Sequence, residues 1–450
     1  MRWMAGWAAI ALLALPSLAF SAPVQDGCMA NATASLIAFV HGDYAGTGKD
    51  FSPQLAKALP AAKLAQTWGE VQKRVGAYQS HGVAHRQSMQ GKSTAVVPVK
   101  FAQSALDFVA TCDASNRISA FYLLNPAVVE AARPVKAQTT AAGVRVEPLN
   151  VPSPVGPLRG ALTFPASQGP FPAVVLVAGS GAHDLDETVE GNKPFRDIAE
   201  GLAKAGIASL RYDKRTFDYA QQVALNPDFT IDDEVTNDAL TALHLLAKQS
   251  RIDPRRVFVL GHSLGAQMAP RIAQRDPQLA GVIMLAAPAR SFLVVVAAQI
   301  RELGSQQGMS AAEVDKREKA IAAELKLLDA SDAKNPPKGS FELLPGRSVS
   351  QVYLLSLHDV RQVATARSLT LPMLVLQGAN DFQVSPTLGF DAWKAALAGK
   401  RNVRFRLYPG LSHLFTPGPT KSPADYTTPA HVDPEVIADI ANWIKAQPAN

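Results

Sequence analysis

The chain has 450 residues, 47% of them hydrophobic and 18% charged, which excludes a chain disordered throughout and is enough for two or three domains with buried cores. The formal net charge of +6 comes from 44 basic and 38 acidic residues that form no dense basic cluster, so we expect no nucleic-acid partner. Two cysteines are too few for a disulfide-rich scaffold or a Cys-rich zinc site.

Residues 1–21 have the pattern of a secretory signal peptide. A basic residue precedes an apolar run from Trp3 to Phe20, and the small residues Ala19 and Ser21 fit cleavage after Ser21. The alternative is an uncleaved anchor, but Pro16 interrupts the run, which is barely long enough to span a bilayer. We therefore expect a periplasmic or secreted protein without a membrane span after cleavage.

An oxidising compartment would allow the two cysteines, Cys28 and Cys112, to form a disulfide. Closing a loop of that size would stabilise the fold by about 4 kcal/mol in the chain-entropy model. Two buried free thiols are the alternative. We favour the disulfide, because an exported protein with only two cysteines usually pairs them.

Residues 22–125 form one compositional unit. Helical patterns are followed by strand-like runs, in the order 31–39, 64–75, 94–101, 105–110 and 118–123. This order predicts a small α+β domain with an antiparallel sheet. His81 and His85 are four residues apart but have no third ligand nearby, so we expect no metal there.

Residues 126–157 contain six prolines and mark the predicted domain boundary. Proline is unfavourable inside helices and central strands. We therefore expect an extended linker or a sheet edge over this segment.

From residue 158 to 450, strand-like apolar runs alternate with helical patterns. The predicted strands are 173–177, 207–210, 257–260, 282–285, 373–376 and 403–407. The alternation predicts a mainly parallel sheet covered by helices on both faces. Residues 290–369 interrupt it with three helical patterns and no strand between them. We expect a helical cap over the ligand-binding edge of the sheet, with a packing appendage as the alternative.

The strongest chemical motif is G-x-S-x-G, from Gly261 to Gly265, between a predicted strand and a predicted helix. This is the context of a nucleophile elbow, which would lift the Ser263 hydroxyl above the sheet edge. The elbow would also direct the Leu264 amide at the reacting centre. An ordinary structural turn is the alternative.

A serine hydroxyl needs a base, and in this arrangement an acid and a histidine follow the serine along the chain. Asp381 and His413 each follow a predicted strand, and we predict that they complete a triad with Ser263. Three further histidines have lesser expected roles: His431 is the fallback base, His262 a packing residue and His358 a residue of the cap.

The loop Gly179-Ser180-Gly181 follows the predicted strand 173–177, where a second oxyanion donor should lie. Its glycines would let backbone amides approach a developing negative charge. We assign the Ser180 amide, with Gly181 as the neighbouring candidate. Loss of such a donor typically costs about 3–4 kcal/mol of transition-state stabilisation.

Two charged segments follow these motifs. The segment His183–Asp186 could suggest a metal, but its ligands alternate along one short loop and have no distant partner, so we expect no metal. For Arg211–Arg215, at the end of a predicted strand, we expect a structural ion-pair cluster, with a clamp for a substrate carboxylate as the alternative. No phosphate-binding or dinucleotide motif is found, and we expect no cofactor.

With these motifs, residues 156–450 resemble the α/β-hydrolase family. The segments Ala178–Asp184, Asn192–Phe195 and Arg211–Arg215 are similar to a bacterial carboxylesterase-like subgroup. Many relatives have His where this chain has Ala178, and that His usually braces the oxyanion loop. The resemblance therefore leaves the support of this loop open.

Members of that subgroup often carry a small, cone-shaped N-terminal α+β domain of unknown function, which residues 30–125 resemble. The resemblance implies a serine hydrolase that cleaves small carboxylic esters through an acyl-enzyme. A peptidase or amidase with the same triad is the alternative enzyme. A binding or scaffold protein on a degenerate hydrolase frame is the alternative without catalysis.

Overall fold

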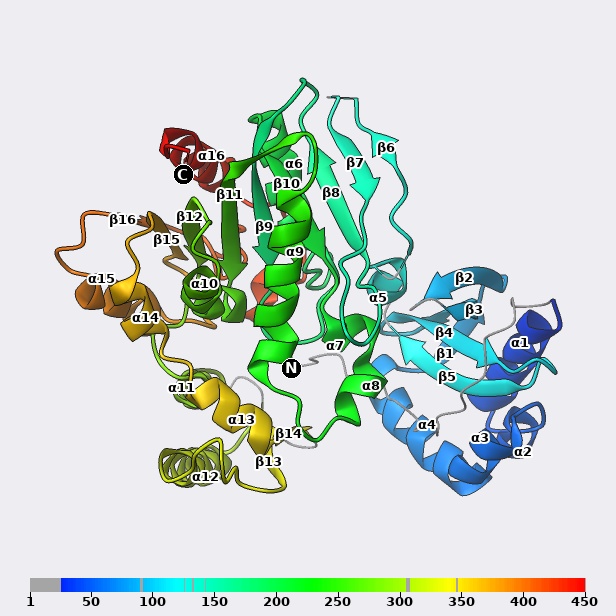
Figure 1. The fold of residues 1–450 in the computed structure, drawn as a ribbon. Helices are drawn as coiled ribbons and strands as arrows, with labels where there is room; N and C mark the ends of the chain where they lie inside the picture. Colours follow the sequence, from blue (N-terminus) through cyan, green and yellow to red (C-terminus); the bar gives the residue numbers. More distant parts are fainter. Residues whose placement is uncertain are drawn as a thin grey trace. The chain divides into compact units, whose positions relative to one another are not determined.

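The computed structural model describes residues 26–89, 92–124, 126–131, 133–141, 143–304, 308–344 and 347–449. The chain divides between Pro134 and Val135 into an N-terminal and a C-terminal unit (Figure 1). The predicted signal peptide, residues 1–21, lies outside the described residues. No helix in the described ranges has both the length and the apolar character needed to cross a membrane.

The N-terminal unit combines helices with an antiparallel sheet, as predicted. Its elements are α1 (Asp26–Val40), α2 (Tyr44–Thr47), α3 (Pro53–Ala58), α4 (Ala61–Val75), β1 (Tyr78–His81), β2 (His85–Met89), β3 (Lys92–Phe101), β4 (Ala105–Cys112), β5 (Ile118–Leu124) and α5 (Pro126–Ala131). The strand order is β1-β3-β4-β5, with β2 also paired to β3. Phe39 of α1 contacts the rings of Trp68 and Phe121, so the apolar faces of helices and sheet share one core.

The predicted disulfide is present in this unit. Cys28 and Cys112 are bonded, with their Cα atoms 6.0 Å apart, and the bond joins α1 to β4 across 84 residues. Cys28 is completely buried, so the bond belongs to the core rather than to the surface.

The C-terminal unit contains a nine-stranded sheet in the order β16-β15-β12-β11-β9-β10-β8-β7-β6. Its strands are β6 (Gln138–Thr139), β7 (Arg145–Pro148), β8 (Gly160–Phe164), β9 (Phe171–Val177), β10 (Ala208–Tyr212), β11 (Ile252–His262), β12 (Gly281–Leu285), β15 (Met373–Gly378) and β16 (Val403–Tyr408). Strands β9 to β12, β15 and β16 pair in parallel, whereas β6, β7 and β8 form an antiparallel edge. The mainly parallel sheet is therefore confirmed.

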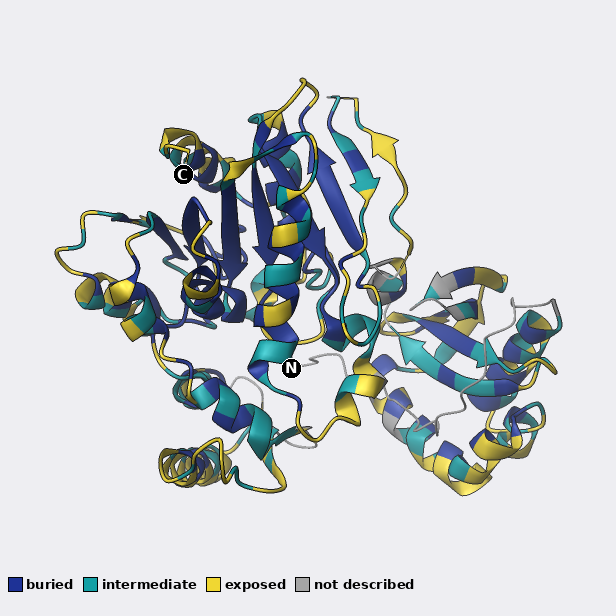
Figure 2. Ribbon diagram, viewed as in Figure 1, coloured by how far each residue is buried: buried dark blue, intermediate teal, exposed yellow. Residues whose placement is uncertain are grey.

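Helices cover both faces of this sheet. The helical elements are α6 (Pro194–Lys204), α7 (Arg215–Asp218), α8 (Ala220–Ala224), η1 (Asp232–Thr236), α9 (Asn237–Ala247), α10 (Leu264–Arg275), η3 (Thr387–Asp391), α15 (Ala392–Ala396), η4 (Pro423–Tyr426) and α16 (Pro434–Ala446). Val174 and Leu176 of β9 belong to the core on the side of α6 and α16, whereas Val175 and Val177 belong to the core on the side of α9 and α10. Burial on both faces explains why the strand is a continuous apolar run, and Figure 2 shows the central strands buried.

Residues 126–157 contain more regular structure than a linker. Helix α5 occupies Pro126–Ala131, and β6 and β7 extend the large sheet at its edge. Pro126 is the first residue of its helix, where the missing N–H removes no helical hydrogen bond. The expected sheet edge is present as β6 and β7. Helix α5 was not expected, because proline at the first position of a helix does not prevent the helix from forming.

The insertion 290–369 contains helices as predicted, but a hairpin of two strands separates two of them, so the expectation of no strand there was wrong. It contains α11 (Phe292–Leu303), α12 (Ala311–Asp329), an antiparallel hairpin of β13 (Ser340–Leu344) and β14 (Arg347–Ser350), α13 (Gln351–His358) and α14 (Gln362–Ser368). The sequence Pro345-Gly346 between the two strands is a turn signal that the helical pattern obscured. The third helical pattern, residues 349–366, is divided into α13 and α14 around Val360, which belongs to the core of the large sheet.

Candidate active site

Ser263 occupies a sharp turn between β11 and α10. Its backbone has φ 52° and ψ −115°, a strained conformation for a residue other than glycine. A Cβ atom on Gly261 would lie 2.2 Å from the carbonyl oxygen of Gly265, and one on Gly265 would lie 2.1 Å from that of Val177. The turn therefore requires glycine on both sides of the serine, which is the geometry expected of a nucleophile elbow.

Two backbone amides lie near this turn. Leu264 is the first residue of α10, so its amide has no acceptor within the helix and lies at the positive end of the helix dipole. A Cβ atom on Gly179 would lie 3.1 Å from the Cβ of Ser263, which places the loop before Ser180 directly against the elbow. The two amides assigned from the sequence thus belong to two segments that border Ser263: the start of α10 and the loop that contains Ser180.

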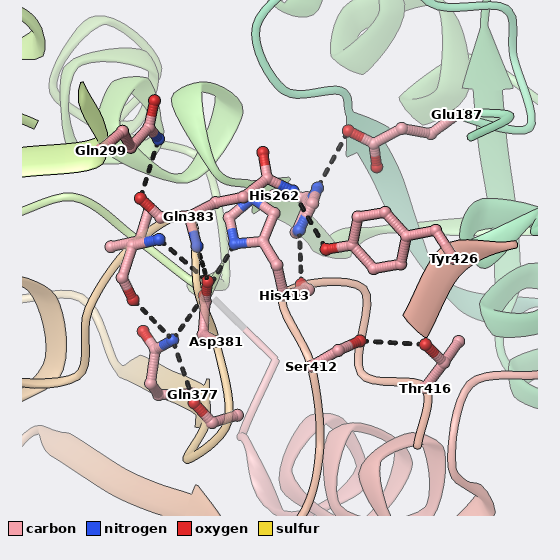
Figure 3. A network of polar contacts seen from close by, with 12 residues as sticks. Glu187, His262, Gln299, Gln377, Asp381, Gln383, Ser412, His413, Thr416 and Tyr426 are labelled. Carbon is pink, nitrogen blue, oxygen red and sulfur yellow. Dashed lines mark hydrogen bonds and ion pairs between the residues drawn. The ribbon is translucent and has the colours of Figure 1, made fainter. Parts of the chain in front are cut away.

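Asp381 and His413 are in direct contact, as Figure 3 shows. Nδ1 of His413 lies 2.7 Å from Oδ2 of Asp381, and the two side chains are almost completely buried. The same carboxylate also accepts hydrogen bonds from the Gln377 side chain and from the backbone amides of Gln383 and Val384, at 2.7–2.8 Å. Asp381 is therefore fixed in position by four donors, one of which is the histidine.

His262 links His413 to the elbow. The centroids of the two imidazole rings are 4.6 Å apart, and Nε2 of His262 donates a hydrogen bond of 2.9 Å to the His413 carbonyl oxygen. His413 therefore lies beside the residue that precedes Ser263. Within the described residues, no hydrogen bond joins the Ser263 hydroxyl to the His413 ring. Such bonds are often long in free enzymes and shorten when substrate binds.

The loop around Ser180 is held by side chains that the sequence did not identify. Oε1 of Glu187 accepts a hydrogen bond from the Gly179 amide at 2.6 Å, and Nζ of Lys214 donates to the Gly179 carbonyl at 2.7 Å. Nε2 of His183 donates to the Ser180 carbonyl at 2.8 Å. The support that relatives are expected to obtain from a His at position 178 is supplied here by other residues.

Lys214 is itself part of a buried chain of contacts. Its ammonium donates to Oε1 of Glu234 at 2.5 Å, and Oε2 of the same carboxylate accepts a hydrogen bond of 2.5 Å from the hydroxyl of Tyr353. Tyr353 belongs to α13 of the insertion. The insertion is thus connected through two side chains to the carbonyl of Gly179.

The segment Arg211–Arg215 is a structural ion-pair cluster, as expected. All three basic residues of the segment form buried pairs: Arg211 with Asp186, Lys214 with Glu234 and Arg215 with Asp238. Although burial opposes ionisation, Arg211, Arg196 and Lys193 keep the pKa of Asp186 below its ordinary value. The carboxylates of the His183–Asp186 segment are thus engaged with cations and hydroxyls, and no metal-holding group of three ligands is found in the part of the chain that the structure describes.

His262 has a more specific environment than the packing role predicted for it. The residue is buried, Nδ1 lies 2.9 Å from Oε1 of Glu187, and Nε2 donates to the His413 carbonyl. Burial is the largest single influence and lowers the pKa of His262, but the charge and hydrogen bond of Glu187, with the His413 carbonyl and the Asp381 charge, together raise it. The other candidate histidines lie elsewhere, His431 against Asp197 and His358 against Asp329.

One general signal could have identified Lys214 and Glu187. A charged side chain directly after a buried strand, or in a loop between buried segments, is buried only when it is paired. Lys214 follows β10 and Glu187 lies between β9 and α6. Their partners are distant in the chain. The sequence therefore predicts that each of the two charged side chains has a partner, but not which residue it is.

Comparison with known proteins agrees with this architecture. A model of the "Alpha/beta hydrolase family" matches residues 174–426, and a model of "Protein of unknown function (DUF3887)" matches residues 35–121. The chain is 39% identical over 291 residues to esterase EstD of Thermotoga maritima, covering 64% of this chain and 66% of EstD. It is 28% identical over 123 residues to esterase FrsA of Klebsiella pneumoniae, covering 27% and 26%. The chain thus spans just under two thirds of EstD and about a quarter of FrsA.

Among solved structures, Est1E from Butyrivibrio proteoclasticus is 16% identical, with a TM-score of 0.42, over 66% of this chain and 96% of Est1E.

Proposed function

The chain belongs to the alpha/beta hydrolase family, and from this premise we propose that it is a serine hydrolase that cleaves carboxylic esters of small molecules. The observation that carries the proposal is the strained elbow at Ser263, whose preceding residue, His262, contacts His413 of the buried Asp381–His413 pair. The similarity to EstD supports an ester as substrate. No cofactor is required by this chemistry.

In the proposed reaction, His413 is the general base. Because Nδ1 carries the proton that is donated to Asp381, Nε2 of the neutral ring is free to take the proton of the Ser263 hydroxyl. The serine oxygen then attacks the ester carbonyl carbon. The protonated His413 returns its proton to the leaving alcohol, which leaves an acyl-enzyme on Ser263. Attack by a water molecule, with the same proton transfers, releases the acid.

The negative oxygen that forms in each step would be stabilised by the amides of Leu264 and Ser180. The Leu264 amide lies at the N-terminus of α10, a helix of 12 residues whose dipole favours negative charge. The Ser180 loop is held by Glu187, Lys214 and His183 at the distances given above. Donors that are fixed before the reaction avoid the free-energy cost of reorganisation in the transition state.

A fluorophosphonate probe tests the nucleophile directly. We expect wild-type protein to be labelled and to hydrolyse p-nitrophenyl acetate, and Ser263→Ala to lose labelling and about 10⁴-fold or more in kcat. Ser368→Ala removes an exposed hydroxyl in α14 and serves as the matched control. Absence of labelling in folded wild-type protein would favour the scaffold alternative.

The amidase alternative is tested with matched substrates. An ester and an amide that share the same acyl group would be compared by kcat/KM. A larger value for the ester supports the proposal, and a comparable or larger value for the amide favours a peptidase or amidase.

We also propose that the protein acts outside the cytoplasm after removal of residues 1–21. The Cys28–Cys112 disulfide supports this, because such bonds persist mainly in oxidising compartments. N-terminal sequencing of protein recovered from the periplasm or the culture medium should begin at Ala22. Recovery of the chain only from the cytoplasm, with Met1 intact, would contradict export.

A further inference from the structure

The two ring nitrogens of His262 face a carboxylate oxygen and a backbone carbonyl oxygen. Nδ1 lies 2.9 Å from the carboxylate oxygen Oε1 of Glu187, and Nε2 lies 2.9 Å from the backbone carbonyl oxygen of His413. A neutral imidazole has only one N–H, so one of these contacts would then bring two lone pairs together. Oε1 of Glu187 also accepts a hydrogen bond from the Gly179 amide, as an ionised carboxylate does. With Glu187 ionised, the geometry requires a proton on each nitrogen, and thus a positively charged ring.

Glu187 is the counterion for this charge. The side chains of Glu187 and His262 are 2% and 6% exposed, so little water is available to solvate either charge. Burial opposes ionisation of both groups. Nevertheless, the pKa of His262 is raised and that of Glu187 is lowered, because each is stabilised by the charge of the other. The two directions agree with an ion pair.

Other titratable groups also face this pair. Three come from the loops after strands, His183 after β9, Asp381 after β15 and His413 after β16, and Tyr426 of η4 interacts with the Glu187 charge. Asp381 favours the charged form of His262, whereas His183 opposes it. Since Glu187 is the nearest carboxylate and the strongest favourable influence, it controls the charge state of the ring.

The ion pair joins the two loops that the proposed reaction needs on either side of Ser263. Oε1 of Glu187 accepts from the Gly179 amide, next to Ser180, and also from His262. His262 in turn holds the backbone of His413. Glu187 has φ 52°, a strained conformation for a residue other than glycine, which this set of contacts must maintain.

We infer that His262 is a doubly protonated positioning residue, whose ion pair with Glu187 fixes the oxyanion loop and the His413 loop relative to each other. This inference rests on the proposed function for its catalytic consequence, but not for the charge of the ring. Neither residue touches the reacting atoms in this role.

The charge of His262 can be measured without any substrate. Ring nitrogen NMR of the full chain, labelled with ¹⁵N-histidine, would be recorded from pH 6 to pH 9, with His262→Gln used to assign the signals. We expect both His262 nitrogens to be protonated at pH 8, whereas a neutral ring with a single N–H at pH 7 would overturn the inference. Because this readout does not depend on hydrolysis, it stands even if Ser263→Ala retains esterase activity and the proposed function fails.

The positioning role is tested with Glu187→Gln. The substitution removes the counterion, so burial should make His262 neutral in the variant, and one of the two hydrogen bonds is lost. Misplacement of a positioned group by about 1 Å can cost about 100-fold. We therefore expect kcat at pH 8 to fall by about 10- to 100-fold, with little change in KM.

The pH dependence separates a charge effect from a general packing defect. The ratio of kcat for Glu187→Gln to kcat for wild type should decrease from pH 6 to pH 9, as His262 in the variant loses its proton. Asp197→Asn, which removes the carboxylate partner of the exposed His431, is the matched control and should give a ratio near one throughout. A constant ratio for Glu187→Gln would overturn the role. If that variant does not fold, the wild-type NMR result decides.

Discussion

The Asp381 carboxylate lies 2.7 Å from Nδ1 of His413, and the two side chains are 0% and 4% exposed. A buried carboxylate in this position selects one tautomer of the ring, with the proton on Nδ1. The orientation is stabilised further by Gln377, which donates to the same carboxylate oxygen at 2.7 Å. The contact therefore determines which ring nitrogen is available as a base.

Asp381→Asn should lower kcat for ester hydrolysis by about 10⁴-fold, because the amide can present an N–H to Nδ1 and select the wrong tautomer. KM should change little. Steady-state kinetics with p-nitrophenyl acetate measure both values. Asp329→Asn removes the carboxylate next to His358 in the insertion and is the matched control, with no expected loss of activity. A loss of less than tenfold for Asp381→Asn would show that another group orients the base.

Tyr353→Phe should affect both stability and rate. The variant leaves Oε2 of Glu234 without its donor, which typically costs about 1–3 kcal/mol of unfolding free energy. Because Glu234 also binds Lys214, which holds the Gly179 carbonyl, we expect kcat to fall several-fold. Urea unfolding and steady-state kinetics measure the two effects.

The control for this prediction is Tyr219→Phe. Its hydroxyl donates to the Pro157 carbonyl at an exposed site, so a smaller loss of stability and an unchanged kcat are expected. If Tyr353→Phe is destabilised but keeps its full kcat, the contact between the insertion and the Gly179 loop has no catalytic consequence.

Replacing both Cys28 and Cys112 by serine should destabilise the N-terminal unit by about 2–5 kcal/mol. All residues of the candidate site lie in the C-terminal unit, so hydrolysis of a small ester at 25 °C should not change. Calorimetry should show an unfolding transition at lower temperature, and the wild type with dithiothreitol should behave in the same way. A parallel loss of kcat would contradict the independence of the site from this disulfide.

Acidification should weaken one partly exposed ion-pair cluster. Burial favours the neutral form of Asp232, but Arg271 and Arg275 outweigh it and lower its pKa to about 2. Since the pKa in the unfolded chain is higher, at 3.8, the stabilisation is complete above about pH 5 and is lost as the pH falls through about 2. The side chain is partly exposed, so we expect about 1 kcal/mol or less.

Urea midpoints at pH 5.5 and pH 2.5 test this expectation. The difference in unfolding free energy between wild type and Asp232→Asn should be larger at pH 5.5. A difference that grows at pH 2.5 would contradict the sign.

The sequence was sufficient for local features whose geometry depends on adjacent residues. Gly261 and Gly265 identify the elbow because no larger residue fits the turn, and these constraints are visible within five residues. Asp381 and His413 could be selected because each follows a buried strand, and parallel strands bring such ends to one edge. The structure places these two side chains in contact.

Contacts between distant residues were not predictable in the same way. Glu187 and His262 are separated by 75 positions, and Lys214 and Gly179 by 35, so their pairing depends on the completed sheet. In the insertion, the short hairpin lacks a long apolar run, and its alternation is too brief to outweigh the helical patterns beside it. The many prolines of residues 126–157 predicted a segment without helix. Pro126 is nevertheless compatible with α5, because it is the first residue of that helix.

Strand β16 follows the other eight strands of the large sheet in sequence. It lies at one edge of that sheet, where its neighbour is β15. The proposed base follows this strand, 150 residues after the elbow. A nascent chain that has emerged as far as β12 would already contain Ser263 but no partner to activate it. Hydrolytic competence would thus arise only after residue 413 has been synthesised and β16 has docked on β15.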